Sequence, residues 1–81
     1  MLLRVHLFAR LRDEIGSSVI ELDFTEQASI AELRSELLRR YPNIVKLLLS
    51  CRVAVNHEFA DDSQLLQASD ELALIPPVSG G

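Results

Sequence analysis

The feature that most constrains the fold is a change of hydrophobic period within a short chain. Residues 2–9, 19–24 and 71–76 alternate apolar and polar side chains, whereas residues 29–41 repeat apolar side chains at steps of three and four. A period of two places successive side chains on opposite faces of a strand, and steps of three and four make one face of a helix. We therefore expect strands before and after one amphipathic helix.

Both ends of the predicted helix have recognisable signals. Ser29 and Glu32 have the spacing of a capping box, in which the hydroxyl and the carboxylate bond to amides of the first turn. Arg39 and Arg40 lie in the last turn, where positive charge complements the helix dipole, and Pro42 ends the helix. The apolar face consists of Ile30, Leu33, Leu37, Leu38 and Tyr41.

The first two strands are expected to form a hairpin. The segment DEIGSS around Gly16 interrupts the alternation as a connection would, and the short spacing favours an antiparallel pair. In the first strand, one face consists of Leu3, Val5 and Leu7 and the other of Arg4, His6 and Phe8.

The C-terminal half predicts three more strands. Residues 51–56 alternate, residues 58–60 return as a short strand after a turn at Asn56-His57, and residues 71–76 form the last strand. The prolines that follow lack amide donors, so the ladder cannot continue past them. We expect Val53 and Val55 to share one face of their strand, Leu72 and Leu74 to face the core, and Ala73 and Ile75 to face away from it.

A single helix with one apolar stripe must lie across one face of the sheet, so the sequence predicts an α+β domain of two layers. Residues 44–50 fit either a short helix or a buried strand, and residues 61–70 predict a loop with one helical turn at Leu65-Leu66. The domain is expected to span residues 1–76, followed by a flexible, extended tail at residues 77–81.

Composition excludes several classes of protein. The net charge of −4 argues against a nucleic-acid partner, because the only cluster of basic residues is Arg34, Arg39 and Arg40 around one helical segment. No apolar run approaches the ~20 residues that span a bilayer, and no signal peptide is recognisable, so we expect a soluble, cytoplasmic protein without membrane partners. Eighty-one residues leave little room for a deep catalytic cleft, which favours a binding or carrier protein.

Conventional catalytic and metal-binding patterns are weak. Cys51, His57 and Asp61 or Asp62 would supply a nucleophile, a base and an orienting group, but their spacing matches no known signature. His6, His57 and Cys51 lack the paired spacing of a metal site. A lone cysteine in an apolar segment is usually buried, so we expect no metal and no catalytic side chain here.

The outward faces of the strands predict a partner surface. Phe8 and Ile75 point away from the core, and they would form one apolar patch with Phe59 if the first and last strands are neighbours. A contiguous apolar patch on a small domain often marks an interface, although single exposed apolar residues are ordinary. We expect Phe8, Phe59 and Ile75 to contact a partner.

The segment IPPVSGG predicts a working tail. Residues 77–81 would reach on the order of 16 Å when extended. Gly80 has no side chain and would thread a narrow channel beside Gly81, with Pro77, Val78 and Ser79 leading to it. The tail is therefore expected to present the α-carboxylate of Gly81 inside the active site of another protein.

Four stretches together resemble a known family: VHLFARLRDEIG, AVN at 54–56, DEL at 70–72 and the terminal PPVSGG. The chain is similar over its whole length to the small sulfur-carrier subunits of molybdopterin synthase, which are ubiquitin-like β-grasp domains. The resemblance implies a mixed sheet of about five strands. Ser69-Asp70 departs from the Gly-Asp turn that is usual in the family, which leaves the geometry of that turn open.

The resemblance also implies a chemistry. An adenylating enzyme related to ubiquitin-activating enzymes would use ATP to convert the Gly81 carboxylate to an acyl-adenylate, and a sulfur donor protein would then leave a thiocarboxylate. The loaded tail would enter the large synthase subunit, which supplies the catalytic side chains of a heterotetramer, and donate sulfur to cyclic pyranopterin monophosphate. This chain itself would bind no cofactor, and Phe8, Phe59 and Ile75 would contact the large subunit.

Three alternatives stay open at this point. A sulfur carrier of thiamine thiazole synthesis would share the Gly-Gly chemistry, but the Pro-Pro pair, the LFARLR stretch and the chain length favour molybdopterin. A ubiquitin-like protein modifier would instead end in an isopeptide bond to lysine. A plain interaction domain would have an idle tail, and removal of Gly81 would then have no effect.

Overall fold

The alternating segments form a mixed five-stranded sheet in the computed structural model, which describes residues 1–77. The strands are β1 (Leu2–Leu7), β2 (Val19–Asp23), β3 (Arg52–Val55), β4 (Glu58–Phe59) and β5 (Leu72–Ile75), in the order β2-β1-β5-β3-β4. β1 pairs antiparallel with β2, as expected, and parallel with β5. The first and last strands are therefore neighbours, which was the condition for a shared apolar patch.

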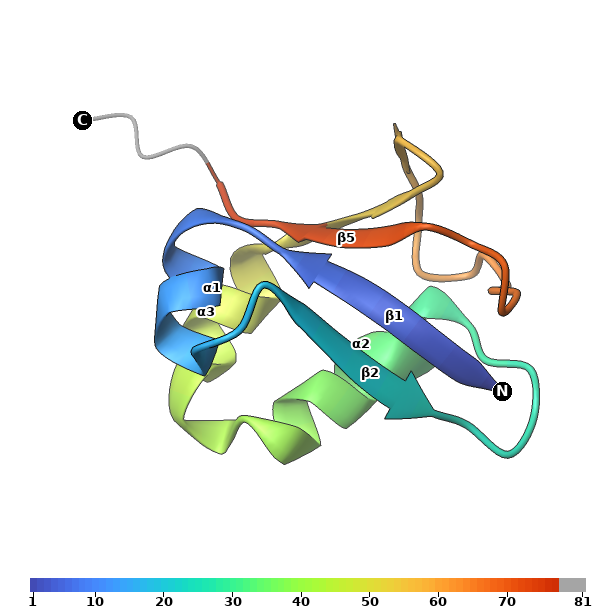
Figure 1. Cartoon of the computed structure of the whole chain (residues 1–81), viewed down its shortest axis with the longest axis horizontal. Helices are drawn as coiled ribbons and strands as arrows, with labels where there is room; N and C mark the ends of the chain where they lie inside the picture. Colours follow the sequence, from blue (N-terminus) through green and yellow to red (C-terminus); the bar gives the residue numbers. More distant parts are fainter. Residues whose placement is uncertain (78–81) are drawn as a thin grey trace.

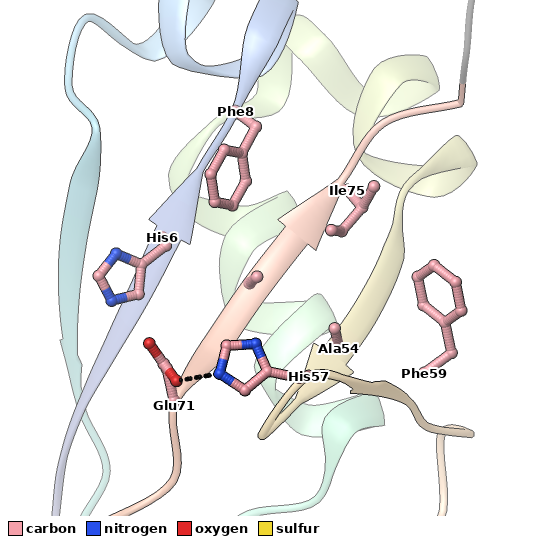
Figure 2. A pocket seen from close by; sticks show the side chains of 8 residues that line it. His6, Phe8, Ala54, His57, Phe59, Glu71 and Ile75 are labelled. Carbon is pink, nitrogen blue, oxygen red and sulfur yellow. Dashed lines mark ion pairs between the residues drawn. The ribbon is translucent and has the colours of Figure 1, made fainter.

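Helices cover one face of this sheet. They are α1 (Ala9–Ile15), α2 (Ile30–Arg40) and α3 (Val45–Ser50), with a short 3-10 helix, η1 (Pro42–Ile44), between α2 and α3. Figure 1 shows α2 beneath the strands, with α1 and α3 at the end of the sheet from which the C-terminal segment leaves. The opposite face has no helix on it within the described residues, and Figure 2 looks directly onto it.

The predicted capping box of α2 is confirmed. The Ser29 hydroxyl accepts a hydrogen bond from the backbone N–H of Glu32 at 3.2 Å, and the Ser29 N–H donates to Glu32 Oε1 at 3.1 Å. Two amides of the first turn are thereby satisfied, so the helix begins where the apolar stripe begins. The stripe itself is buried at Ile30, Leu33 and Leu37.

The core lies between the helices and the inner face of the sheet. The residues that were expected to face inward from β1 and β5 are buried, and the shared face of Val53 and Val55 on β3 is buried with them. Cys51 and Leu66 join them from the segments before β3 and before β5. Among the described residues, the buried core cluster consists of Leu3, Val5, Leu7, Leu11, Ile20, Leu22, Ile30, Leu33, Leu37, Leu48, Cys51, Val53, Val55, Leu66, Leu72 and Leu74.

The connection between β1 and β2 was predicted wrongly as a simple turn. It contains α1, in which the buried Leu11 and the partly buried Ile15 lie four positions apart. This spacing makes one helix face and fills the end of the core. Gly16 ends the helix in the left-handed conformation, with φ of 84° and its N–H donating to the Arg12 carbonyl at 2.8 Å.

Two loop predictions are also resolved. Of the two possibilities for residues 44–50, the structure has a helix, α3. The helical turn expected at Leu65-Leu66 is absent: Leu65 forms an isolated bridge with Ser29 and is exposed, whereas Leu66 is buried. The turn at Ser69-Asp70 needs no glycine, because Asp70 accepts the Gln67 N–H at 2.8 Å and Ser69 has no positive φ.

The strand order, the mixed pairing and the helix across one face make this the ubiquitin-like β-grasp fold that the resemblance implied. It contains three α-helices rather than the single helix of the sequence-based prediction. No helix in residues 1–77 is long and apolar enough to cross a membrane. Val78, Ser79, Gly80 and Gly81 lie outside the described residues, so the expectations for the tail stay predictions.

Candidate functional site

The uncovered face of the sheet contains a groove of about 310 Å³. Phe8, Phe59 and Ile75, which were the predicted interface residues, all line it (Figure 2). The structure thus brings together side chains from three separate parts of the sequence, and their role toward a partner stays a prediction. The other lining residues are His6, Ala54, His57, Glu71 and Ala73.

The groove is hollow because its floor is made of small residues. Ala73 of β5 is in register with His6 of β1 on one side and with Ala54 of β3 on the other. Methyl groups at the centre leave space between the larger side chains at the rim. Phe59 stands opposite Ala54 on the edge strand β4 and forms one wall.

The end of the groove next to the C-terminal segment is apolar. Phe8 and Phe59 are 47% and 52% exposed, which is unusual for large aromatic side chains in a small domain. Phe8 follows β1 and is the N-cap residue of α1, where its extended backbone (φ −131°, ψ 156°) directs the chain into the helix. The Arg52 guanidinium lies 3.8 Å from the centroid of the Phe59 ring, a cation–π contact that orients this ring.

The opposite end of the groove is polar, and the sequence did not predict it. His57 Nε2 lies 2.8 Å from Glu71 Oε2, and both side chains are largely exposed. Figure 2 shows this pair at the start of β5, with His6 beside it and with Phe8 and Ile75 toward the far end of the strand. The groove therefore has one apolar end and one charged end.

Asn56 fixes the backbone beneath the polar end. Its side-chain amide donates to Asp70 Oδ1 at 3.0 Å, and its Oδ1 accepts the N–H of Glu71 at 2.9 Å. Its own N–H donates to the Glu71 carbonyl at 2.8 Å. Asn56 and His57 both have positive φ, at 52° and 72°, in a turn that asparagine tolerates well. The resembling stretches AVN and DEL are thus joined in space at this turn.

The residues considered for conventional catalysis are not brought together. Cys51 precedes β3 and its buried thiol donates to the Leu47 carbonyl at 3.2 Å, whereas His57 follows β3 on the open face. Burial raises the pKa of the Cys51 thiol, and the nearby Arg34 only partly opposes this. Within residues 1–77 no cluster of three histidine, cysteine or acidic side chains is placed to hold a metal ion.

The described end of the chain lies beside the apolar end of the groove. Ile75 is the last residue of β5, Pro76 is half-buried and Pro77 is exposed. The described part of the chain therefore ends next to the apolar side chains of the groove.

Known proteins are similar to this chain over nearly its whole length. The profile of the ThiS family matches residues 5–81, which is nearly the whole chain. The chain belongs to the ThiS family. Its relatives include proteins named molybdopterin synthase sulfur carrier subunit: one from Arabidopsis thaliana is 34% identical over 79 residues, covering 98% of this chain and 82% of that protein. Another, from Dictyostelium discoideum, is 35% identical and covers 96% of this chain and 94% of that protein.

Solved structures of related proteins share the fold. SAMP1 from Haloferax volcanii is 29% identical and superimposes with a TM-score of 0.83, covering 100% of both chains. A chain in the complex of subunits 1 and 2 of molybdopterin-converting factor from Helicobacter pylori is 26% identical, with a TM-score of 0.71 and 100% coverage of both chains. One of these similar proteins was thus solved together with a second subunit.

Proposed function

We propose that this chain is the sulfur carrier of molybdenum cofactor biosynthesis, with Gly81 as its working residue. The observation that supports this most is the apolar groove of Phe8, Phe59 and Ile75 beside the strand from which the C-terminal segment leaves. The family match extends through Gly81, and the named relatives are sulfur carrier subunits of molybdopterin synthase. A docking surface next to a deliverable chain end is what such a carrier requires.

The chemistry at Gly81 takes place in two steps. A carboxylate oxygen attacks the α-phosphorus of ATP on an adenylating enzyme, pyrophosphate leaves, and an acyl-adenylate forms. Hydrosulfide supplied by a sulfur donor protein then attacks the carbonyl carbon and AMP leaves, which exchanges one carboxylate oxygen for sulfur and releases a proton. The resulting thiocarboxylate is ionised and nucleophilic at neutral pH, and it would donate its sulfur to cyclic pyranopterin monophosphate.

The large synthase subunit would supply the catalytic side chains. In this chain the groove residues would bind the partner, and the tail residues Pro77, Val78, Ser79 and Gly80 would deliver Gly81. Phe8, Phe59 and Ile75 would be covered by the large subunit, since exposed aromatic side chains gain most from burial at an interface.

Intact mass spectrometry tests the proposal directly. The chain is incubated with the adenylating enzyme, ATP and a sulfur source, and we expect a mass gain equal to the exchange of one oxygen for sulfur, located at Gly81 by fragmentation. Deletion of Gly81 should abolish both the gain and the sulfuration of the pterin, while the thermal unfolding transition stays unchanged. No gain with an activating system that loads a known carrier would refute the proposal.

A second candidate function is protein modification. The supporting observation is the similarity to small archaeal modifier protein 1 of Haloferax volcanii, which is 28% identical with a TM-score of 0.80. In that case the activated Gly81 would form an isopeptide bond with lysine amines of other proteins. Adducts that resist boiling in reductant and contain a Gly-Gly remnant on lysine after proteolysis would favour it, whereas a carrier alone would form none.

A further inference from the structure

The groove on the open face is apolar at one end and has a carboxylate at the other. Arg52 is in register with Ile75 and lies against Phe59 near the apolar end, but it does not line the groove. Glu71 marks the other end, one residue before β5 begins. A partner segment that lies in the groove would therefore meet apolar side chains at one end and a carboxylate at the other.

The backbone of Glu71 is held in place, which positions its carboxylate to pair with a cation. Its backbone N–H and carbonyl are both bonded to Asn56, so the residue that bears the carboxylate is fixed before any partner arrives. Its side chain is nevertheless 55% exposed, and its Oε2 lies 2.8 Å from His57 Nε2. A fixed and accessible carboxylate loses little conformational freedom when it forms an ion pair.

The floor between these ends is shaped for one inserted side chain. Ala54 and Ala73 leave the hollow, and Phe8 and Phe59 form its apolar walls. An aliphatic or aromatic side chain would displace water from this hollow, and a charged side chain would not. The contiguous arrangement of hollow and carboxylate therefore selects for an apolar residue with a cation close to it.

From this geometry we infer that the groove binds a partner segment with an apolar side chain over Ala54 and Ala73 and a lysine or arginine at Glu71. Glu71 is then the specificity-determining residue of the surface, and His57 holds its carboxylate over the groove until the cation pairs with it. The net charge of −4 favours a basic partner in the same sense. The inference rests on the proposed function in that the partner is the large synthase subunit.

The test compares charge reversal at two neighbouring carboxylates. Glu71→Lys places a cation at the end of the groove, whereas Glu58→Lys makes the same change at an exposed residue of β4 that does not line the groove. Binding of the large synthase subunit is measured by calorimetry at low and high salt. We expect Glu71→Lys to weaken binding about tenfold or more and to reduce its salt dependence, and Glu58→Lys to change affinity by less than about threefold.

Two further variants locate the contact. Glu71→Gln removes the charge with little change of shape, so it should produce a smaller loss of affinity in the same direction. Ala73→Leu fills the hollow without touching the core face and should weaken binding with the salt dependence retained. Circular dichroism and urea unfolding confirm that each variant is folded before its affinity is interpreted.

The outcomes separate this inference from the proposed function. If the unaltered chain binds the large subunit and becomes a thiocarboxylate, but Glu71→Lys behaves like Glu58→Lys, the inference is overturned and the proposed function stands. Tighter binding by Glu71→Lys would also overturn it and indicate an acidic partner segment. Loss with Ala73→Leu alone would indicate a purely apolar occupant and overturn it equally. If the unaltered chain neither binds the large subunit nor becomes a thiocarboxylate, both the inference and the proposed function are refuted.

Discussion

The two faces of the sheet are built from the same strands, yet they differ in everything that matters for function. On β5, Leu72 and Leu74 are buried under the helices, whereas the alternate residues Ala73 and Ile75 line the open groove. The covered face is filled with leucine and valine and needs no partner. The open face presents aromatic side chains to solvent and ends in charged groups. The first face therefore determines stability, and the second is available for recognition.

The largest effect should come from the covered face. Leu33 of α2 is fully buried, so Leu33→Ala removes apolar contacts and leaves a cavity. We expect the free energy of unfolding to fall by about 2–5 kcal/mol, measured by urea denaturation. Leu65→Ala is a matched control because Leu65 is 56% exposed, and it should cost less than about 0.5 kcal/mol. Equal losses in the two variants would contradict the division into two faces.

Phe8 should separate binding from stability. Phe8→Asp places a charge in the apolar end of the groove and should weaken large-subunit binding by several kcal/mol, about a hundredfold or more. The same residue is the N-cap of α1 and makes no side-chain cap, a position that aspartate fills well. The free energy of unfolding of Phe8→Asp should therefore be about 1 kcal/mol larger than that of Phe8→Ala. Its affinity for the large subunit should nevertheless be lower than that of Phe8→Ala.

The affinity and the stability of these variants test the interface role and the N-cap role of Phe8 separately. If Phe8→Asp binds the large subunit as tightly as the unaltered chain, Phe8 lies outside the interface. If Phe8→Asp is less stable than Phe8→Ala, the N-cap role of this position is wrong. Calorimetry for affinity and urea denaturation for stability measure the two quantities on the same samples.

A smaller effect is expected at the capping box. Ser29→Ala removes the acceptor for the Glu32 N–H and should lower the free energy of unfolding by about 1 kcal/mol. Ser35 lies on the exposed side of α2, and Ser35→Ala should be neutral or slightly stabilising because alanine is the better helix former. Affinity for the large subunit should stay unchanged in both, since neither residue is on the open face.

The sequence predicted most of the covered face and the apolar half of the open face. Both follow from local periodicity: the alternation within β1, β3 and β5 assigns each side chain to a face whatever the neighbouring strand is. The assignment of Phe8 and Ile75 to one patch needed only the additional condition that β1 and β5 are adjacent. That condition is met by the parallel pairing of the two strands.

The parts that were missed depend on contacts that no local pattern contains. The helix α1 has seven residues and one buried side chain, so the single four-residue step from Leu11 to Ile15 was too short a pattern to outweigh the preceding alternation. The helix α3 is held from outside, since the Arg34 guanidinium donates to the carbonyls of Leu48 and Cys51 at 3.0 and 2.9 Å.

The polar end of the groove likewise joins distant segments. The Asn56 side chain donates to the side chain of Asp70, which is fourteen residues later in the sequence. The pairing of β3 with β5 brings the two residues together. Asn-His and Ser-Asp pairs are ordinary turn residues when they are read separately. Their joint role in placing Glu71 emerges only from the register of β3 and β5.

The smallest expected effect concerns Cys51, at the margin of the covered face. It tests whether solvent is excluded from this margin. Burial raises the pKa of the Cys51 thiol, so the folded chain holds the proton at a pH where the unfolded chain has lost it. The stabilising contribution is complete below the ordinary thiol pKa of about 8.5 and is lost as the pH rises through the higher pKa of the folded state. The free energy of unfolding should therefore decrease above about pH 8.5, and Cys51→Ala, which has no thiol, should lack this part of the slope. An identical slope in both proteins, or rapid reaction of the native thiol with Ellman's reagent, would show that solvent reaches Cys51 and that the covered face is open there.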